Sequence, residues 1–329
     1  MTRRKIKVKV YQKINLSLNI LGTRGDMHVL DTVTASVDNG DTVTVCERFD
    51  DIINVEFSRF PGAVQGNSDG GRGGVSDADQ NSEDGGCANF RVSDIVQNNT
   101  ALKAAEILRG QFGPFGADIY IDKNIPVSAG LGGSSADAAG VIVALDAMFD
   151  FSARGLSAQA AALKTGSDVP AMLTGGFLRV GGTGGKIERL NSARELFAVV
   201  CKGAAGVNSG RAYAEFDKMY PSKKFAPSNN DALVSALANG DMAGVIRNVG
   251  NALAAPAIAL CPEINSALAA LSSVGADCAF MTGSGSACVG LFPSLAAARA
   301  AAASLSARNL YARAQSTLPL GVEILSRNF

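Results

Sequence analysis

A glycine- and serine-rich run, PVSAGLGGSSADAA at residues 126–139, separates a strand-like pattern from a long apolar stretch. The strand-like segment ADIYIDKNIPV leads into it, and VIVALDAM, a run of small and apolar residues that favours a helix, follows it. Between a strand and a helix, successive backbone N–H groups point at one spot, where the helix dipole also favours negative charge. The run therefore predicts a phosphate-binding loop in a fold that mixes strands and helices.

Two common glycine-loop signatures do not fit this run. A Walker loop needs GK[ST] after its glycines, and the dinucleotide fingerprint needs a third glycine where Ser135 stands. Taken alone, the run fits a structural alternative equally well: a helix start whose small residues allow close packing.

The first sixty residues alternate between polar and apolar residues, which is typical of strands. The pattern is carried by KIKVKVY, INLSLNI, TVTASV, DTVTVCE and DIINVEFSRF, and the segments GTRGD and DNGD resemble turns between them. We therefore expect an antiparallel sheet. From about residue 61 to residue 86 the chain has almost nothing to bury, which predicts a disordered surface loop rather than a linker between domains.

Composition argues against several classes of protein. The 30 basic and 30 acidic residues balance, so no basic surface predicts nucleic-acid binding. No apolar run is long enough to predict a membrane span, and the start MTRRKIKVKVYQ lacks the apolar core of a signal peptide. The 6 cysteines show no CxxC pair or other metal spacing, so we expect reduced, buried thiols and a cytoplasmic location.

Three further stretches contain residue types that phosphoryl transfer uses. YQKINLSL places Lys13 and Asn15 two apart on a strand, so that both side chains leave the same face. KTGSDVPAML sets Asp168 before a Val-Pro pair, and AFMTGSGSACVGLF is a second glycine-serine turn. Each has a plain alternative, namely a solvated lysine, a turn or cap aspartate, and a tight connection between strands.

In that order, QKINLSLN, PVSAGLGGSSADAA, GSDVPAML and MTGSGSACVGLF resemble the motifs of the GHMP kinase superfamily. Within it, the details resemble the kinases that act on a cytidine diphosphate-linked methylerythritol. YQKINL is similar to their PAKINL, LGGSSADAA to their GGGSSDAA, and GSDVP to their GADVP. SGRAYAEFD, NNDAL and NTALKAAEIL are lesser similarities, and the resemblance covers nearly the whole chain outside about residues 61–86.

The resemblance implies a two-domain α+β fold. An N-terminal ATP-binding domain, like the second domain of ribosomal protein S5, would span residues 1–188, and a ferredoxin-like C-terminal domain would span residues 189–329. The sequence agrees, since helical runs such as NNDALVSALANGDMAGVIRNV and EINSALAALSSVG alternate with the strand-like LFAVVCK and CAFMTGS. The cleft between the domains would hold the substrate.

The resemblance also implies ATP-dependent phosphorylation of the 2-hydroxyl of the cytidyl-linked methylerythritol, in non-mevalonate isoprenoid biosynthesis. The acceptor would be a tertiary alcohol, a weak nucleophile until its proton is withdrawn. Asp168 would accept that proton, and Lys13 would orient Asp168 and offset charge on the acceptor oxygen or the moving phosphoryl group. Mg2+ would arrive as MgATP, with no protein carboxylate assigned to it. We expect a monomer or homodimer that binds neither nucleic acid nor membrane.

The other implied site residues fall into two groups. Asn15, His28 and Asp137 would contact the substrate, although Asp137 has a structural alternative in helix capping and dipole compensation. ATP would lie along the glycine-rich run, whose backbone amides would hold the α- and β-phosphates, while the Ser135 hydroxyl would touch a phosphate or the magnesium shell. This second group consists of Pro126, Val127, Ser128, Ala129, Gly130, Leu131, Gly132, Gly133, Ser134, Ser135 and Ala136.

The chain departs from the resemblance at two places. His28 stands where the family has the histidine of a Tyr-His pair that recognises cytosine, but Met27 replaces the aromatic residue, and methionine cannot stack as a ring does. The glycine-rich run also lacks one glycine before its two serines. Two alternatives therefore stay open: a GHMP kinase that acts on a mevalonate-, homoserine- or sugar-like alcohol, and a non-catalytic nucleotide-binding relative. Retention of Lys13 and Asp168 argues against the second.

Overall fold

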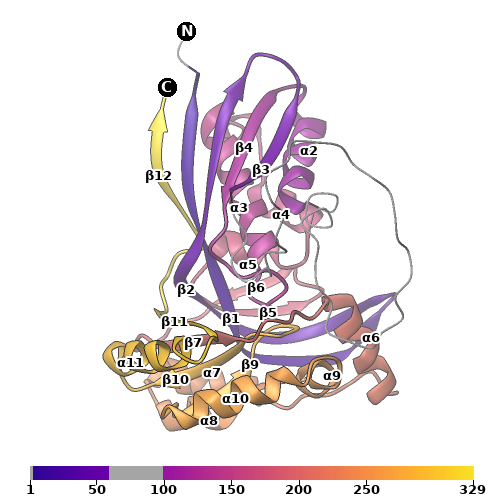
Figure 1. Ribbon diagram of the computed structural model, residues 1–329. Helices are drawn as coiled ribbons and strands as arrows, with labels where there is room; N and C mark the ends of the chain where they lie inside the picture. The colour runs from indigo at the N-terminus through magenta and orange to yellow at the C-terminus, as the bar shows by residue number, and fades with distance from the viewer. Residues whose placement is uncertain (1–2, 59–98) are drawn as a thin grey trace, which may run out of the picture.

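The computed structural model describes residues 3–58 and 99–329, which form two sheets with helices packed against them (Figure 1). The surface loop predicted at about residues 61–86 lies outside the described residues. Two long neighbouring strands, β1 and β2, run from the upper part of Figure 1 into the lower part.

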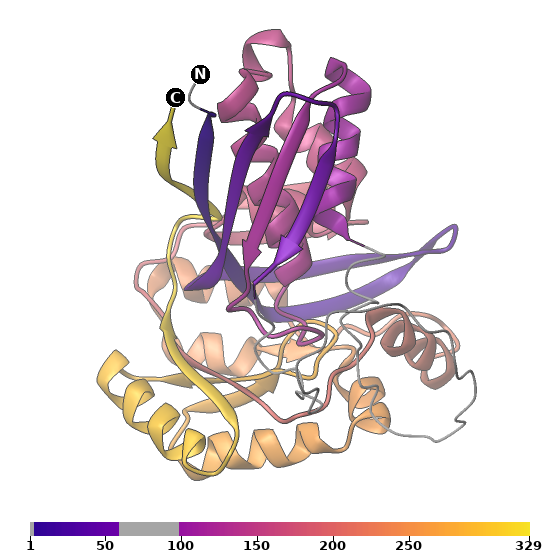
Figure 2. The same cartoon turned by 45° about the horizontal axis from the view of Figure 1, so that its top comes forward.

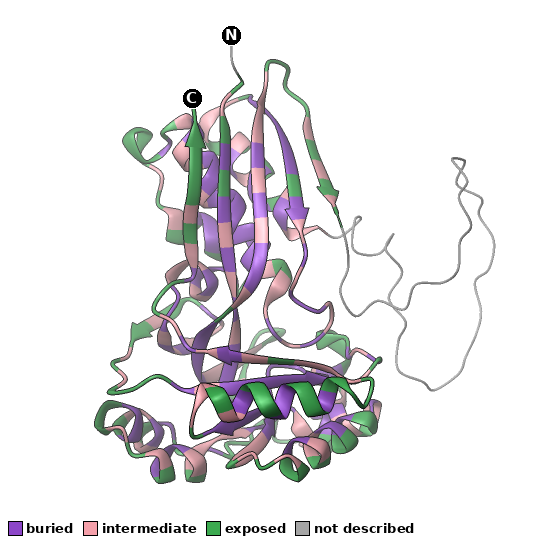
Figure 3. Ribbon diagram, turned by 60° about the vertical axis from the view of Figure 1, so that its left-hand side comes forward, coloured by how far each residue is buried: buried purple, intermediate pink, exposed green. Residues whose placement is uncertain are grey.

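Among the described residues the larger sheet has eight strands, in the order β12-β1-β2-β4-β3, with β5 and β6 beside β2 and β8 beside β1. Their bounds are β1 Lys5–Arg24, β2 Met27–Arg48, β3 Ile53–Phe57, β4 Gly116–Asp122, β5 Phe177–Gly182, β6 Lys186–Arg189, β8 Gly250–Asn251 and β12 Val322–Asn328. Most neighbours are antiparallel, as the alternating pattern predicts, and Figure 3 shows buried residues alternating with more exposed ones along the upright strands. The exceptions are the pairs β3–β4 and β1–β8, which are parallel.

The predicted turn at DNGD does not exist, although the turn at GTRGD does. Strand β2 continues through DNGD, where two extra residues form a bulge opposite the step from Tyr11 to Gln12. Asp38 Oδ1, in this bulge, accepts a hydrogen bond from the backbone N–H of Ser316, 3.2 Å away. A partner far along the chain therefore satisfies polar groups that a turn would have left to solvent.

The helices beside the larger sheet determine the position of the glycine-rich run. They are α2 Thr100–Phe112, α3 Gly133–Phe149, the short 3-10 helix η1 Ser152–Arg154, α4 Ala158–Thr165 and α5 Val169–Thr174. Helix α3 packs closely on β1 and β2, because a Cβ atom at Gly140 would stand only 2.5 Å from Val10 Cγ1. As a result α3 is buried over most of its length, and its first residues lie at a fixed place beside the sheet.

The smaller sheet has the antiparallel order β11-β7-β10-β9 among the described residues. Its strands are β7 Phe197–Lys202, β9 Cys278–Met281, β10 Cys288–Phe292 and β11 Tyr311–Ser316. The helices of this part are α6 Ser209–Met219, α7 Asn230–Asn239, α8 Met242–Asn248, α9 Ala254–Leu260, α10 Glu263–Ser273 and α11 Leu295–Ser306. The predicted run NNDALVSALANGDMAGVIRNV forms two helices, because Gly240 ends α7 with φ 69° and Asp241 caps α8.

The two parts of the molecule share strands. Strand β12, which lies in the sequence range expected for the second domain, pairs with β1 in the larger sheet. The far end of the β1–β2 hairpin reaches α6, as the two views in Figures 1 and 2 agree. The boundary between residues 188 and 189 stays a prediction.

The described residues contain no single helix that is long and apolar enough to cross a membrane. Helices α9 and α10 reach the required length and composition only when they are taken together, and the pair is bent by 117° at the break between them.

Candidate active site

A large pocket lies where β1, the glycine-rich run and α6 approach one another. It has a volume of about 1130 Å³. Its lining includes Lys13, Asn15, His28, Asp137, Asp168 and residues 126–135, so the structure brings almost all of the predicted site residues to one place. Ala136 is the exception, since it is buried beneath the pocket and does not line it.

The glycine-rich run ends at the start of a long helix whose first backbone N–H groups have no capping side chain. Helix α3 begins at Gly133, and the residue before it, Gly132, has φ 74° and provides no side-chain cap. The first turn of α3 carries no acidic side chain that would occupy the positive end of the helix dipole. Backbone N–H groups at the start of α3 are therefore available to an anion in the pocket.

The second glycine-serine turn, between β9 and β10, braces this run. Backbone packs directly on backbone, because a Cβ atom at Gly130 would lie 2.4 Å from Thr282 O and one at Gly283 would lie 2.2 Å from Gly130 O. The backbone N–H of Ala287 also donates a hydrogen bond to Ala129 O (3.1 Å). The turn is thus more than a tight connection, since it holds the predicted phosphate loop in place.

Lys13 and Asp168 face each other across the pocket. Lys13 Nζ lies 3.6 Å from Asp168 Oδ2, and the exposed fractions of the two side chains are 11% and 50%. Lys13 is therefore not a solvated surface lysine. Asp168 stands at the N-cap position of α5, yet its side chain makes no capping hydrogen bond, so the carboxylate is free to act on a ligand.

Asn15 fixes the lysine from the same strand. Its side-chain oxygen accepts a hydrogen bond from Lys13 Nζ (2.5 Å), and its Nδ2 donates to Thr32 Oγ1 (2.8 Å). The backbone N–H of Lys13 donates to Leu131 O (3.1 Å), which ties β1 to the glycine-rich run. The lysine is thus held both to its own strand and to the loop.

His28 lies at the other end of the pocket, where β2 meets α6. Its Nε2 is 2.8 Å from Asp217 Oδ1, and its ring stacks on Tyr213 with a centroid distance of 4.7 Å and an interplanar angle of 25°. Burial raises the pKa of Asp217, but the hydrogen bond from His28 and the charge of Lys223 outweigh it and hold that pKa below its usual value. Met27 also lines the pocket and is half exposed.

The sequence reasoning missed Tyr213. Burial, with a smaller contribution from the negative charge of Asp168, raises the pKa of its hydroxyl, so the residue is a neutral aromatic wall of the pocket. Its segment, SGRAYAEFD, is only a lesser similarity to the family in the sequence. An aromatic residue on an amphipathic helix usually belongs to the core, so the sequence alone offered no stronger signal.

Asp137 is buried and does not cap α3. Its Oδ2 lies 2.6 Å from Lys123 Nζ, and the same nitrogen lies 2.5 Å from Asp41 Oδ2. Burial lowers the pKa of Lys123, but the two carboxylates outweigh burial and raise it overall, so the lysine stays charged. The sequence reasoning missed both Lys123 and Asp41.

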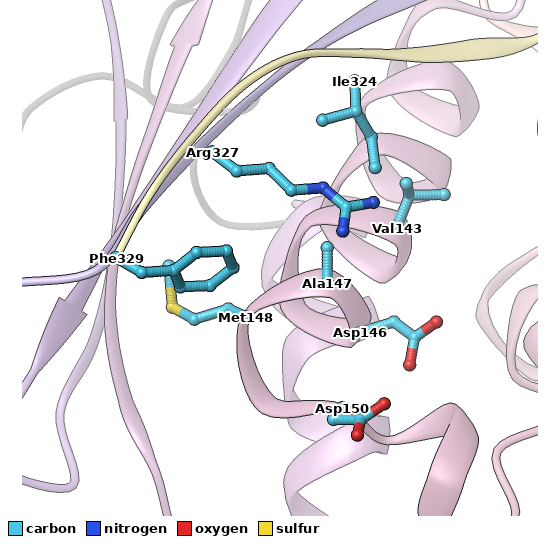
Figure 4. Close-up of a pocket in the computed structure, with 8 residues that line it drawn as sticks. All are labelled: Val143, Asp146, Ala147, Met148, Asp150, Ile324, Arg327 and Phe329. Carbon is cyan, nitrogen blue, oxygen red and sulfur yellow. The ribbon is translucent and has the colours of Figure 1, made fainter.

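No group of three or more His, Cys, Asp or Glu side chains placed to hold a metal ion occurs within residues 3–58 and 99–329. A second, smaller hollow of about 490 Å³ lies between α3 and β12, where Arg327 extends over Val143 and Ala147 (Figure 4). It contains neither a glycine-rich loop nor a lysine-aspartate pair, so the larger pocket is the candidate active site.

Comparison with known proteins places the chain in a family. The model of the GHMP kinases N terminal domain matches residues 99–176, and that of the GHMP kinases C terminal domain matches residues 233–312. A 4-diphosphocytidyl-2-C-methyl-D-erythritol kinase of Cutibacterium acnes is 33% identical, covering 92% of this chain and 90% of its own length. The enzyme of the same name from Pelotomaculum thermopropionicum is 36% identical, covering 88% of this chain and 90% of its own length.

The fold agrees with the sequence relatives. A crystal structure of 4-(cytidine 5'-diphospho)-2C-methyl-D-erythritol kinase superposes with a TM-score of 0.70 at 27% identity, covering 94% of this chain and 98% of the other. The predicted two-domain GHMP kinase fold is thereby confirmed. The chain therefore belongs to the GHMP kinases, which are ATP-dependent small-molecule kinases, and within them to the 4-diphosphocytidyl-2-C-methyl-D-erythritol kinase family.

Proposed function

We propose that this protein transfers the γ-phosphoryl group of ATP to the 2-hydroxyl of 4-diphosphocytidyl-2-C-methyl-D-erythritol, a step of non-mevalonate isoprenoid biosynthesis. The observation that carries the proposal is the 3.6 Å approach of Lys13 Nζ to Asp168 Oδ2 in the pocket that the glycine-rich run also lines. A base opposite a phosphate loop suits phosphoryl transfer to an alcohol and has no purpose in a protein that only binds nucleotide.

The glycine-rich run is the proposed site of the ATP phosphates. The uncapped N-terminus of α3 supplies backbone N–H groups and the positive end of a dipole, and the brace from Gly283 keeps these donors at fixed positions. Mg2+ would be held mainly by phosphate and water, since it retains several waters when few carboxylates are present. Its role would be to neutralise charge on the transferred group, and Ser135 is the residue of this chain proposed to lie near it.

Asp168 is the proposed general base, and Lys13 is the proposed partner that sets its charge and orientation. The half-exposed carboxylate is open to the substrate side of the pocket, while the lysine is held by Asn15. As the acceptor proton moves to Asp168, Lys13 stays close enough to stabilise negative charge on the acceptor oxygen or the phosphoryl group.

The His28 end of the pocket is the proposed cytidine site. If Asp217 accepts the Nε2 proton, Nδ1 of His28 is left as an acceptor for the exocyclic amino group of cytosine. Tyr213 supplies an aromatic wall beside the histidine, which compensates for the aromatic residue that Met27 replaces. Asn15 and Asp137 stay predictions as substrate contacts, as do the cytoplasmic location and the monomeric or homodimeric state.

The His28→Ala variant is expected to raise KM for the cytidyl substrate by about tenfold or more and to leave KM for ATP nearly unchanged. The reason is that His28 contacts Asp217 and Tyr213 on α6, so the substitution is expected to remove only a hydrogen bond and a ring contact to the base. Steady-state kinetics with each substrate varied in turn would measure both constants. A rise in KM for ATP alone would contradict the assignment of His28 to the cytosine.

The proposed reaction is tested by ATP consumption with the whole cytidyl substrate beside the same molecule without its cytidyl group. Fast turnover of the whole substrate alone is the expected result. Equal turnover of both molecules would reject cytidine recognition, and turnover of mevalonate or homoserine in place of either would move the protein to another branch of the GHMP kinases. ATP binding without turnover of any alcohol would favour the non-catalytic alternative.

A further inference from the structure

Asp41 is a fully buried carboxylate that lies outside the pocket yet holds the start of the glycine-rich run. The residue is on β2, just after the bulge, and its side chain is 0% exposed. Its Oδ1 accepts hydrogen bonds from the backbone N–H groups of Asn124 (2.5 Å) and Ile125 (2.8 Å). These two residues directly precede Pro126, so one carboxylate oxygen fixes the point where the chain enters the run.

The other oxygen of Asp41 reaches the far end of the run through Lys123. Asp41 Oδ2 accepts from Lys123 Nζ (2.5 Å), and the same ammonium group donates to Asp137 Oδ2 (2.6 Å) near the start of α3. Lys123 and Asp137 line the pocket, whereas Asp41 does not. The three side chains therefore clamp residues 126–136 at both ends, from a position beneath the proposed phosphate site.

The clamp is costly to build, which argues that its geometry matters. Two carboxyl groups and one ammonium group are withdrawn from water, and burial outweighs the charge of Lys123 and raises the pKa of Asp137. Such a buried set gives stability only if its members are well paired. Asp137 Oδ1 is buried without any hydrogen-bond partner among the described residues and belongs to a side chain that lines the pocket. An apolar cluster would fill the same space without that unsatisfied group.

We infer that Asp41 is a positioning residue for the nucleotide: it fixes the two ends of the glycine-rich run through Asn124, Ile125 and Lys123 and never touches the ligand. The inference rests on the proposed function, since it takes the run to be the ATP site. Because misplacing aligned groups by about 1 Å can cost on the order of a hundredfold in rate, a buried anchor of this kind has a measurable effect at a distance. That effect falls mainly on ATP, because Asp41 holds the chain where it enters the glycine-rich run, whereas the proposed cytidine site is formed by His28 and α6.

The first test is Asp41→Asn, which keeps an oxygen for the two N–H groups and removes the charge that pairs with Lys123. We expect Kd for ATP, measured by calorimetry, to rise about tenfold, while Kd for a cytidine nucleotide changes less than about twofold. Asp118→Asn is the matched control, because Asp118 is also a mostly buried carboxylate in this sheet, paired with Arg48 and Asn54 and away from the pocket. That variant should lower the melting temperature without changing Kd for ATP.

A second comparison keeps the test decisive if Asp41→Asn does not fold. In a background that combines Lys123→Met with Asp137→Asn, the buried cation and one buried carboxylate are both removed. In that background Asp41→Asn removes the last buried charge but keeps an acceptor for Asn124 and Ile125, whereas Asp41→Ala deprives them of it. We expect the variant with Asp41→Ala to bind ATP about tenfold more weakly than the one with Asp41→Asn in the same background. Equal affinities in that pair, or wild-type ATP affinity in the single variant Asp41→Asn, would overturn the inference. Failure of the wild-type protein to bind ATP would instead reject the proposed nucleotide site, so the two failures are distinct.

Discussion

Asp168→Asn lowers kcat by about a hundredfold or more and leaves Kd for ATP nearly unchanged: this is the result expected if Asp168 is the general base. The substitution preserves the size of the side chain but removes the group that accepts the proton of the acceptor alcohol. Asp168 makes no capping hydrogen bond in the structure, so loss of the carboxylate should leave the melting temperature nearly unchanged. Single-turnover kinetics at saturating ATP, with calorimetry for nucleotide binding, would separate the chemical step from binding.

Asp150→Asn is the control for this prediction. Asp150 has φ 52°, a conformation that Asn also adopts readily, and it lies outside the candidate active site. Its turnover should match that of the wild-type protein. Near-normal turnover of Asp168→Asn would remove Asp168 from the mechanism, and an equal loss in both variants would show that the effect is not specific to the site.

Gly130→Ala is expected to reduce kcat/KM by about a hundredfold or more and to lower the melting temperature. Gly130 has φ 75°, a conformation that costs a residue with a Cβ atom about 1–2 kcal/mol. The added Cβ would also lie 2.4 Å from Thr282 O, so the glycine-rich run must move away from the second glycine-serine turn. Displacement of the proposed phosphate donors then lowers both ATP affinity and the rate.

Gly110→Ala is the control for Gly130→Ala, because Gly110 is an exposed glycine inside α2 and a Cβ atom there has no other atom within 4 Å. This substitution should stabilise the protein by about 0.5–1 kcal/mol and leave activity unchanged. The pair is measured by thermal unfolding and by steady-state kinetics. Wild-type ATP affinity in Gly130→Ala would show that the run tolerates movement and that its exact path is not needed for binding.

Local patterns predicted the parts of the fold that depend on neighbours in sequence. The alternation of polar and apolar residues predicted the strands around Lys13, and the glycine-rich run predicted the start of α3 to within a residue or two. The turn predicted at DNGD was wrong because the structure there depends on a residue far away in the sequence. Its polar residues look like a turn, but a partner near the other end of the chain, Ser316, stabilises them inside a strand.

The site residues could be predicted only where the sequence motifs resemble those of the GHMP kinases. Spacing alone gave no reason to place Lys13 beside Asp168, which the fold brings together across the pocket. Asp41 lies inside β2 in a segment that resembles a turn, and Lys123 directly follows β4. Charged residues in such places usually face solvent, so nothing local marked either residue as buried. Their burial follows from where α3 packs on the sheet, and that is a property of the tertiary structure.

The pairing of β12 with β1 bears on how the molecule loses its structure when heated. The last strand of the chain completes the sheet that supports Lys13, so the first half of the chain does not contain all of its own framework. The halves should melt together, in one cooperative transition, and ATP bound at the glycine-rich run should raise the melting temperature of both. In this molecule the nucleotide would act as a thermal stabiliser of the smaller sheet, whose β9–β10 turn contacts the glycine-rich run through Thr282, Gly283 and Ala287.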